Sequence, residues 1–213
     1  MTPAIAWDAL GHPMWVLRYL RSGGIPMMRN WMPYAPPGAS ASEVADLYGS
    51  LTPAPMTDWG QIDRIRKAWP NHLVIKGLLH PGDVRLAQQH GADGVVISNH
   101  GGRQLDTAPS PLEVLPVVRA AVGEGFPLIL DSGVRRGSDL VIARCLGADS
   151  TISGRPTLFG VAAAGEPGAA RALQLLRHEL ETIMRQIGCA QLADLGRDHL
   201  WSSHIDTPPD AAR

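Results

Sequence analysis

The sequence predicts an α/β protein that contains half of an eight-stranded (β/α)8 TIM barrel, made of four βα units. Short apolar runs rich in β-branched residues alternate with helical patterns, which is typical of βαβ units and a parallel sheet. The turn Gly-Ala-Asp leads into a strand twice, at residues 91–93 and 147–149, which indicates a repeated βα unit. A complete barrel has eight strands. The chain therefore either pairs with another half or is the C-terminal half of a longer protein.

Length and composition predict a globular protein and exclude several classes of partner. The 213 residues are enough for one domain with a core, and 45% of them are hydrophobic. A net charge of -1 gives no electrostatic basis for nucleic-acid binding. Cys145 and Cys189 have neither the spacing of a disulfide framework nor neighbours that would hold a metal. No signal peptide and no apolar run of about 20 residues is present, so we expect a cytoplasmic protein.

Residues 1–57 are the least regular part of the sequence, and they allow two interpretations. Trp15, Tyr19 and neighbouring leucines are interleaved with Arg18 and Arg21. Apolar side chains with cationic tips are typical of a segment that lies among lipid headgroups. The same pattern also fits a short helix and a loop that pack on the rest of the protein.

A domain follows over residues 58–200, and its elements can be assigned in order. Its first helix begins at Thr57, which we expect to be the N-cap, and ends at Pro70. The later helices carry apolar residues at helical spacing, and the last one stops at Gly188. The first three strands are short and apolar and are bounded by turn residues, whereas the fourth, Ser150 to Ser153, is polar. We expect strands at 73–77, 94–98, 127–131 and 150–153, helices at 81–90, 111–122, 137–146 and 167–187, and a disordered tail at 201–213.

Polar residues follow the second strand, at the end of the sheet where barrel enzymes build their sites. Residues 98–104 read Ser-Asn-His-Gly-Gly-Arg-Gln. His100 is the candidate general base, because a neutral imidazole accepts a proton near neutral pH. Arg103 offers a planar fork that holds a carboxylate through two hydrogen bonds. The alternatives are a structural histidine and an arginine in a surface ion pair, for example with Asp106.

The ends of the other strands carry the remaining candidates. Lys76 closes the first strand, where a cation would stabilise negative charge on a bound group, although a surface lysine is the alternative. Ser98 closes the second strand and would either hydrogen-bond that group or be an ordinary satisfied hydroxyl. Glycine-arginine turns follow the third and fourth strands, and such turns beside helix starts form phosphate cradles. These turns contain Asp131, Ser132, Gly133, Val134 and Arg135 after the third strand, and Gly154 and Arg155 after the fourth.

These motifs resemble those of the FMN-dependent 2-hydroxy acid dehydrogenases and oxidases, the family of the lactate, glycolate and mandelate enzymes. Ser-Asn-His-Gly-Gly-Arg-Gln is similar to the family signature, and the lysine strand and both glycine-arginine turns fall in the order that the family requires. The resemblance runs from about residue 7 to residue 200 and corresponds to the C-terminal half of the family's barrel. The family's first four strands, its substrate-contacting tyrosines and the aspartate that orients its base lie outside this match. Ser132 stands where many members have glycine, although mandelate-type members also carry serine.

The resemblance implies FMN as the cofactor and assigns a role to each candidate. Lys76 and Ser98 would contact the flavin, and Asp131 the ribityl chain. Gly133, Arg135, Gly154 and Arg155 would hold the phosphate, with Ser132 and Val134 in the same loop. His100 and Arg103 would bind the substrate, with His100 as the catalytic base. No metal is implied.

The implied reaction is oxidation of an (S)-2-hydroxy acid, mandelate- or lactate-like, to the 2-oxo acid, with hydride passed to FMN. We further expect a homo-oligomer. The resemblance favours peripheral contact of residues 1–57 with the inner face of the plasma membrane, and this aromatic, basic segment favours a membrane quinone over oxygen as the acceptor. One alternative is a truncated, non-catalytic half barrel that binds FMN weakly or only as an oligomer. Another is an isomerase that uses reduced FMN, but that chemistry has no need of a carboxylate fork beside a base.

Overall fold

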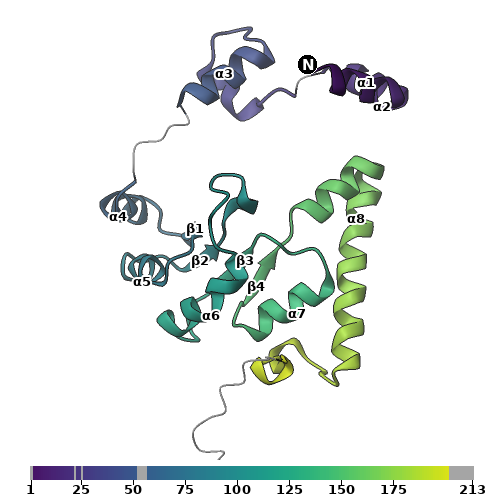
Figure 1. Cartoon of the computed structure of the whole chain (residues 1–213). Coiled ribbons are helices and arrows are strands. Elements are labelled where there is room, and N and C mark those ends of the chain that lie inside the picture. The colour runs from purple at the N-terminus through teal and green to yellow at the C-terminus, as the bar shows by residue number, and fades with distance from the viewer. Residues whose placement is uncertain (1, 22, 25, 52–56, 202–213) are drawn as a thin grey trace, which may run out of the picture. The chain divides into compact units, whose positions relative to one another are not determined.

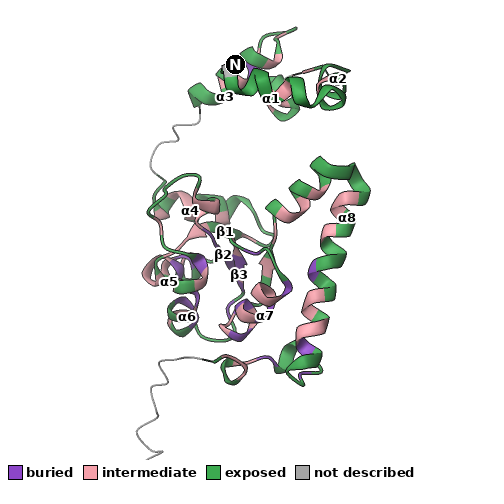
Figure 2. Ribbon diagram, turned by 45° about the vertical axis from the view of Figure 1, so that its right-hand side comes forward, coloured by how far each residue is buried: buried purple, intermediate pink, exposed green. Residues whose placement is uncertain are grey.

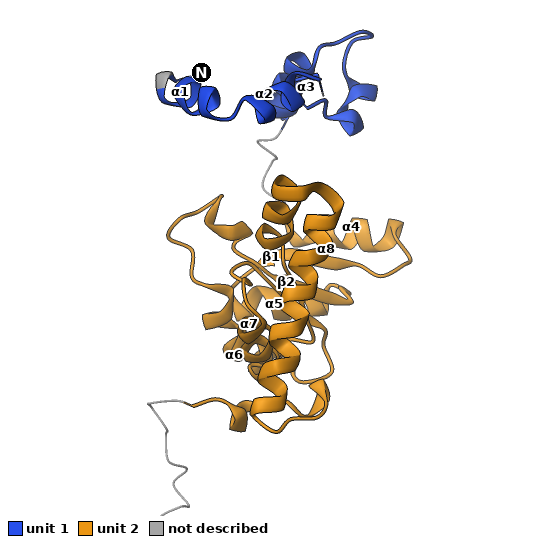
Figure 3. Cartoon of the chain, turned by 90° about the vertical axis from the view of Figure 1, so that its right-hand side faces the viewer, with its two compact units in different colours: residues 1–57 blue, residues 58–213 orange. Residues whose placement is uncertain are grey.

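The computed structural model describes residues 2–21, 23–24, 26–51 and 57–201. Two compact units make up the chain, residues 1–57 and 58–213 (Figure 3). The predicted disorder of the tail concerns residues that, apart from Trp201, lie outside this described part.

The larger unit is built on a parallel sheet with the strand order β1-β2-β3-β4 (Figure 1). Each strand agrees with its predicted range to within one residue at either end. The predicted half barrel of four βα units is therefore confirmed. The strands are β1 (Val74–Leu78), β2 (Gly94–Ile97), β3 (Leu128–Asp131) and β4 (Ser150–Ile152).

Helices pack on one face of this sheet and bury its apolar side chains. Val95 and Ile97 of β2 and Leu128 of β3 are fully buried, as are Leu115 and Val118 of α6 (Figure 2). A second, smaller cluster joins α7 to α8. The helical elements of this unit are α4 (Trp59–Ala68), α5 (Pro81–Gln89), η2 (His100–Gly102), α6 (Pro111–Val122), α7 (Gly137–Cys145), α8 (Arg155–Gln186), η3 (Leu192–Asp194) and η4 (Arg197–His199).

Two helix starts differ from the prediction. The N-cap of α4 is Asp58 and not Thr57, because the Asp58 carboxylate accepts a hydrogen bond from the Gln61 amide at 2.8 Å. Helix α8 begins at Arg155 and not at Pro167. Its backbone breaks at Ala164 and Gly165, and Gly165 has a φ of 63°, so the predicted helix corresponds to the part that follows this break.

The two Gly-Ala-Asp turns form the same structure at the start of β2 and of β4. Asp93 exchanges two hydrogen bonds with Leu73: its amide donates to the Leu73 carbonyl at 2.8 Å, and its carboxylate accepts from the Leu73 amide at 2.7 Å. Asp149 makes the same pair of bonds with Leu128, both at 2.8 Å. The repeat seen in the sequence is therefore also a repeat of hydrogen bonds.

The smaller unit contains more regular structure than we expected. Its elements are α1 (Pro3–Gly11), α2 (Pro13–Arg21), η1 (Arg29–Tyr34) and α3 (Ala41–Leu51). Large apolar side chains of α1 and α2 face solvent: Trp7 is 79% exposed, Leu10 72% and Trp15 60%. Among the described residues, none of the helices is long and apolar enough to cross a membrane.

Candidate functional site

A charged network joins the C-terminal ends of β1, β2 and β3. Ser98 is buried directly after β2, and its hydroxyl donates to Asp131 Oδ2 at 2.6 Å. The Ser98 hydroxyl oxygen in turn accepts hydrogen bonds from Lys76 Nζ at 3.1 Å and from the His100 amide at 3.0 Å. One donated and two accepted bonds satisfy a hydroxyl completely. Ser98 therefore links the lysine of β1, the aspartate of β3 and the loop that carries His100.

Lys76 and Asp131 form the ion pair of this network. Lys76 Nζ lies 2.9 Å from Asp131 Oδ2, and the two side chains are 42% and 15% exposed. Burial by itself would raise the pKa of Asp131, but the hydrogen bonds from Ser98 and Lys76 and the charge of Lys76 outweigh it and lower that pKa. Asp131 is therefore ionised at neutral pH.

The loop after β2 turns sharply and places the His100 imidazole against β1. The Asn99 side chain accepts from the Gly101 amide at 3.0 Å, and His100 itself has a φ of 55°, in the left-handed region. A Cβ atom added to Gly77 would lie 2.7 Å from His100 Cε1. Gly77 also has a φ of 102° and sits at a register irregularity in β1. Glycine at position 77 therefore makes the space that the imidazole occupies.

A hollow of about 170 Å³ opens beside this loop. Its lining brings together the glycine loop after β2, the turn after β3, the start of α6 and the start of α8. The lining contains one cation, hydroxyls and glycine backbone, and no carboxylate. It consists of Asn99, Gly101, Gly102, Ser110, Pro111, Ser132, Gly133 and Arg155. This donor set suits an anion such as a phosphate.

Ser132 connects the two loops that line the hollow. Its hydroxyl accepts from the Gly101 amide at 3.0 Å, and its φ of 85° is unusual for a residue other than glycine. Arg155, at the start of α8, reaches the same loop, because its guanidinium lies 3.6 Å from where a Gly101 Cβ would be. The structure therefore assembles Ser132, Gly133 and Arg155 around one hollow.

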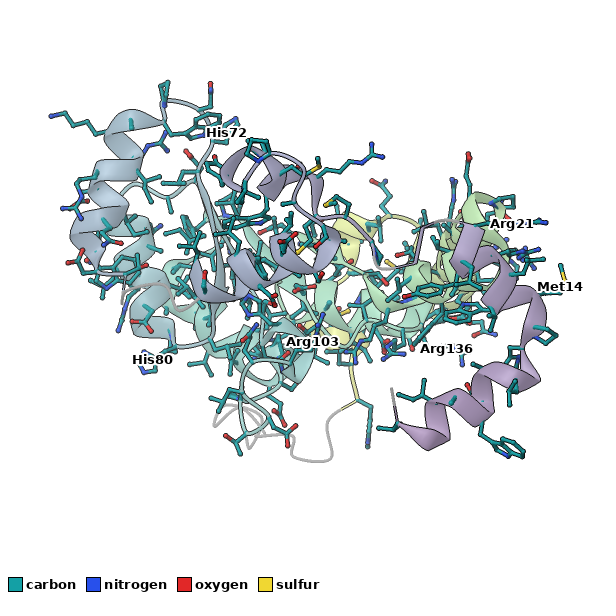
Figure 4. The ribbon with its side chains drawn as sticks, turned by 90° about the horizontal axis from the view of Figure 1, so that it is seen from above. Met14, Arg21, His72, His80, Arg103 and Arg136 are labelled. Carbon is teal, nitrogen blue, oxygen red and sulfur yellow. The ribbon has the colours of Figure 1, made fainter. Side chains whose placement is uncertain are left out.

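Other predicted site residues lie outside this lining. Val134 is buried in the hydrophobic core, so that only its backbone is available to a ligand. The Arg135 guanidinium lies 5.8 Å from the centroid of the Phe159 ring, and Gly154 is not among the lining residues. Arg103, labelled in Figure 4, is exposed, and its guanidinium forms no ion pair with another of the described residues.

The sequence analysis missed several residues of the site, among them Gly77, Asn99 and Ser110. Gly77 gives His100 its space, the Asn99 side chain shapes the loop, and Ser110 lines the hollow. A glycine directly after a lysine in an apolar strand was the available signal for Gly77. Nothing in the sequence marked Ser110 as a site residue except its place before a helix. Ser110 comes close to Gly133 only when β2 and β3 pair in the folded sheet.

The fold and the site together define half of a barrel protein with a hollow at the C-terminal ends of its strands whose lining suits an anion. Residues 1–202 match the family of FMN-dependent dehydrogenases, and the chain belongs to that family. FMN is the cofactor of this family.

Relatives of known activity cover most of this chain. It is 39% identical to (S)-mandelate dehydrogenase of Pseudomonas putida over 204 residues, which are 94% of this chain and 50% of that protein. It is 44% identical to L-lactate oxidase of Alicycliphilus denitrificans over 169 residues, 79% of this chain and 46% of the oxidase. The chain therefore spans about half the length of the curated relatives it matches.

Solved structures give the same result. The structure of the monotopic membrane protein (S)-mandelate dehydrogenase matches 94% of this chain and 52% of its own, with a TM-score of 0.86 and 39% identity. A mandelate oxidase solved with (S)-4-hydroxymandelic acid matches 68% of this chain and 40% of its own, with a TM-score of 0.64 and 40% identity.

Proposed function

We propose that this chain is the cofactor-binding and catalytic half of an enzyme that oxidises an (S)-2-hydroxy acid to the 2-oxo acid with FMN. The observation that carries this proposal is the grouping of His100, the Lys76–Ser98–Asp131 network and the anion hollow at one end of the sheet. Mandelate and lactate, for which the two relatives are named, are both 2-hydroxy acids.

The residues at the strand ends fit the parts of FMN. The phosphate would lie in the hollow with the Arg155 guanidinium and the backbone of Gly133, with Arg135 and Gly154 close by in the chain. Lys76 and Ser98 would contact the flavin, and Asp131 the ribityl chain. When bound, FMN supplies the two-electron acceptor of the reaction.

The substrate would be held by the loop after β2. The exposed Arg103 guanidinium would bind the substrate carboxylate through two hydrogen bonds. A ring nitrogen of His100 would accept the proton of the 2-hydroxyl group as the substrate is oxidised. The ion pair with Asp131 would hold the Lys76 cation at the end of β1, where it stabilises negative charge on the cofactor.

The anion hollow can be tested by FMN binding. We expect quenching of FMN fluorescence when the purified chain is titrated into the cofactor. Arg155→Ala should weaken binding by about 10- to 100-fold, the equivalent of one charge-assisted hydrogen-bonded pair. Arg171→Ala removes an exposed arginine from α8 and is the matched control. Equal affinities for the two variants would refute the phosphate assignment.

The reaction can be tested by flavin reduction. The chain is co-expressed with the part of the Pseudomonas putida enzyme that it does not match, and the purified complex is mixed anaerobically with lactate, mandelate or glycolate. We expect the yellow flavin absorbance to bleach with at least one acid. His100→Asn should abolish bleaching, while His178→Asn on the exposed face of α8 should not. Bound flavin that stays oxidised with all three acids would favour the non-catalytic alternative.

The smaller unit supports a second element of the proposal, peripheral contact with a membrane. Trp7, Leu10 and Trp15 expose apolar surface on α1 and α2, and Arg18 and Arg21 lie in the last turn of α2. A membrane quinone would then be the electron acceptor. We expect the chain to float with anionic phospholipid vesicles, Trp15→Ser to weaken flotation, and Trp69→Ser, an exposed tryptophan of the larger unit, to leave it unchanged. Absence of flotation would refute this element.

A further inference from the structure

Helix α8 is made of two segments that meet at a break in its backbone (Figure 1). The first segment, residues 155–163, begins at Arg155, which lines the hollow of about 170 Å³. The break follows at Ala164 and Gly165, whose φ and ψ are not helical, and the second segment runs over residues 166–186. Because of this break, the place of Arg155 depends on how the first segment is held against the second.

The second segment is anchored to α7. Its Met184 is buried in the cluster that joins the two helices. The backbones also touch, because a Cβ atom added to Gly137 at the start of α7 would overlap with the Leu180 amide nitrogen, and the Gly137 amide donates to the Glu179 carboxylate at 2.8 Å. Since the turn after β3 leads directly into α7, the second segment has a fixed place relative to that wall of the hollow.

The first segment crosses the second at two glycines. A Cβ atom added to Gly160 would overlap with the Gly168 carbonyl oxygen, and one added to Gly168 would overlap with the Gly160 carbonyl oxygen. Neither glycine has a positive φ, so its backbone conformation is open to any residue. Alanine is a better helix former than glycine. It is therefore the close approach of the two backbones that excludes a side chain at positions 160 and 168.

Side-chain packing within this chain does not hold the first segment in place. None of residues 155–163 is buried. Phe159 lies one turn after Arg155, on the same face of the helix, and its ring centroid is 5.8 Å from the Arg135 guanidinium. At an exposed site such a cation–π contact is weak. The contact that fixes the segment is therefore the glycine crossing.

We propose that Gly160 and Gly168 are positioning residues for the phosphate site. Their crossing brings the first segment close enough for the Arg155 guanidinium to reach the loop at Gly101. A methyl group at either glycine would push the two segments apart. The first segment would then move as a body, because it has no buried side chain, and would carry the guanidinium away from the hollow. This inference rests on the proposed function, since it takes the FMN phosphate as the ligand of the hollow.

The test compares two flavins that differ only in the phosphate. The affinities of the purified chain for FMN and for riboflavin are measured by quenching of flavin fluorescence. We expect Gly160→Ala and Gly168→Ala to weaken FMN binding about tenfold, through misplacement of the arginine, and to leave riboflavin binding unchanged. Gly60→Ala is the matched control and should bind both flavins as the parent chain does. It also alters a helical glycine, but its Cβ would meet only the Asp58 side chain, at 3.4 Å.

A double-mutant cycle with Arg155→Ala shows whether the glycines act through the arginine. G160A/R155A should bind FMN no more weakly than R155A, because no guanidinium is left to misplace. Circular dichroism checks that each variant is folded. Losses that add in the double variant would overturn the inference, as would equal weakening of FMN and riboflavin binding in the glycine variants.

The same measurements separate this inference from the proposed function. Weakened FMN binding in R155A with parental affinity in G160A and G168A would overturn the role of the glycines and leave the phosphate site in place. Parental affinity in R155A would overturn the phosphate site and this inference together.

Discussion

Arg119 of α6 donates a hydrogen bond to Asp149 Oδ2 at 2.6 Å, and the same carboxylate oxygen accepts from the Leu128 amide at 2.8 Å. The arginine is 6% exposed and also donates to the carbonyls of Gly123, Phe126 and Gly147. One side chain thus ties the end of α6 to the starts of β3 and β4. These contacts lie at the N-terminal ends of the strands, and they fix the strands whose C-terminal ends carry the site.

Replacing Arg119 should destabilise the larger unit much more than replacing Arg66 of α4, which donates to Asp93 as Arg119 does to Asp149. Arg119→Ala removes a nearly buried donor from three backbone carbonyls and from Asp149, whose half-exposed carboxylate keeps only its bond from the Leu128 amide, and this costs about 3 kcal/mol of unfolding free energy. The Arg66 side chain is 24% exposed, so water can replace it in part. Urea unfolding of both variants checks the difference. Equal losses of unfolding free energy in the two variants would show that burial of the arginine side chain does not add to stability.

The sequence predicted the strands well because three of them are short apolar runs between turn residues, whereas the register that sets Val95 opposite Leu128 is visible only in the folded sheet. The start of α8 could not be predicted, because Gly165 interrupts the helical backbone and Pro167 resembles a first-turn proline. The site was predicted as a set of strand ends. That His100 lies against Gly77 depends on the irregular register of β1, which no local pattern encodes.

The ion pair of the site should make the stability of the larger unit depend on pH in acid. The pKa of Asp131 is lowered in the folded chain, so its contribution to stability is present at neutral pH and is lost as the pH falls below about 4 toward the lowered value. Asp131→Asn should be less stable at neutral pH and should show a flatter fall in acid. Urea midpoints measured across this pH range check the prediction, with Asp106→Asn, which removes an exposed carboxylate, as the control. Parallel curves for the parent chain and Asp131→Asn would refute it.

Gly77→Ala should displace the His100 ring. The new Cβ would lie 2.7 Å from His100 Cε1, and the φ of 102° adds backbone strain. Gly102→Ala is the matched control, because its φ of 74° also strains an alanine but its Cβ would meet nothing within 4 Å. We expect the NMR signal of the His100 Cε1 proton, assigned with His100→Asn, to move in Gly77→Ala and to keep its position in Gly102→Ala. The same shift in both variants would mean that backbone strain, and not contact, positions the ring.

Ser132 should hold the loop after β2 through its hydroxyl at the cost of backbone strain. Ser132→Gly relieves the strain of a φ of 85° but removes the acceptor of the Gly101 amide, two changes of about 1 kcal/mol each and of opposite sign. Its unfolding free energy should therefore stay close to that of the parent chain. Ser132→Ala keeps the strain and loses the bond, so it should be less stable by about 1 kcal/mol. The Gly101 amide should exchange with solvent faster in both variants, because the Asn99 side chain is then its remaining acceptor. Unchanged exchange at Gly101 would show that Asn99 alone fixes the loop, and the serine at this position would then contribute only strain.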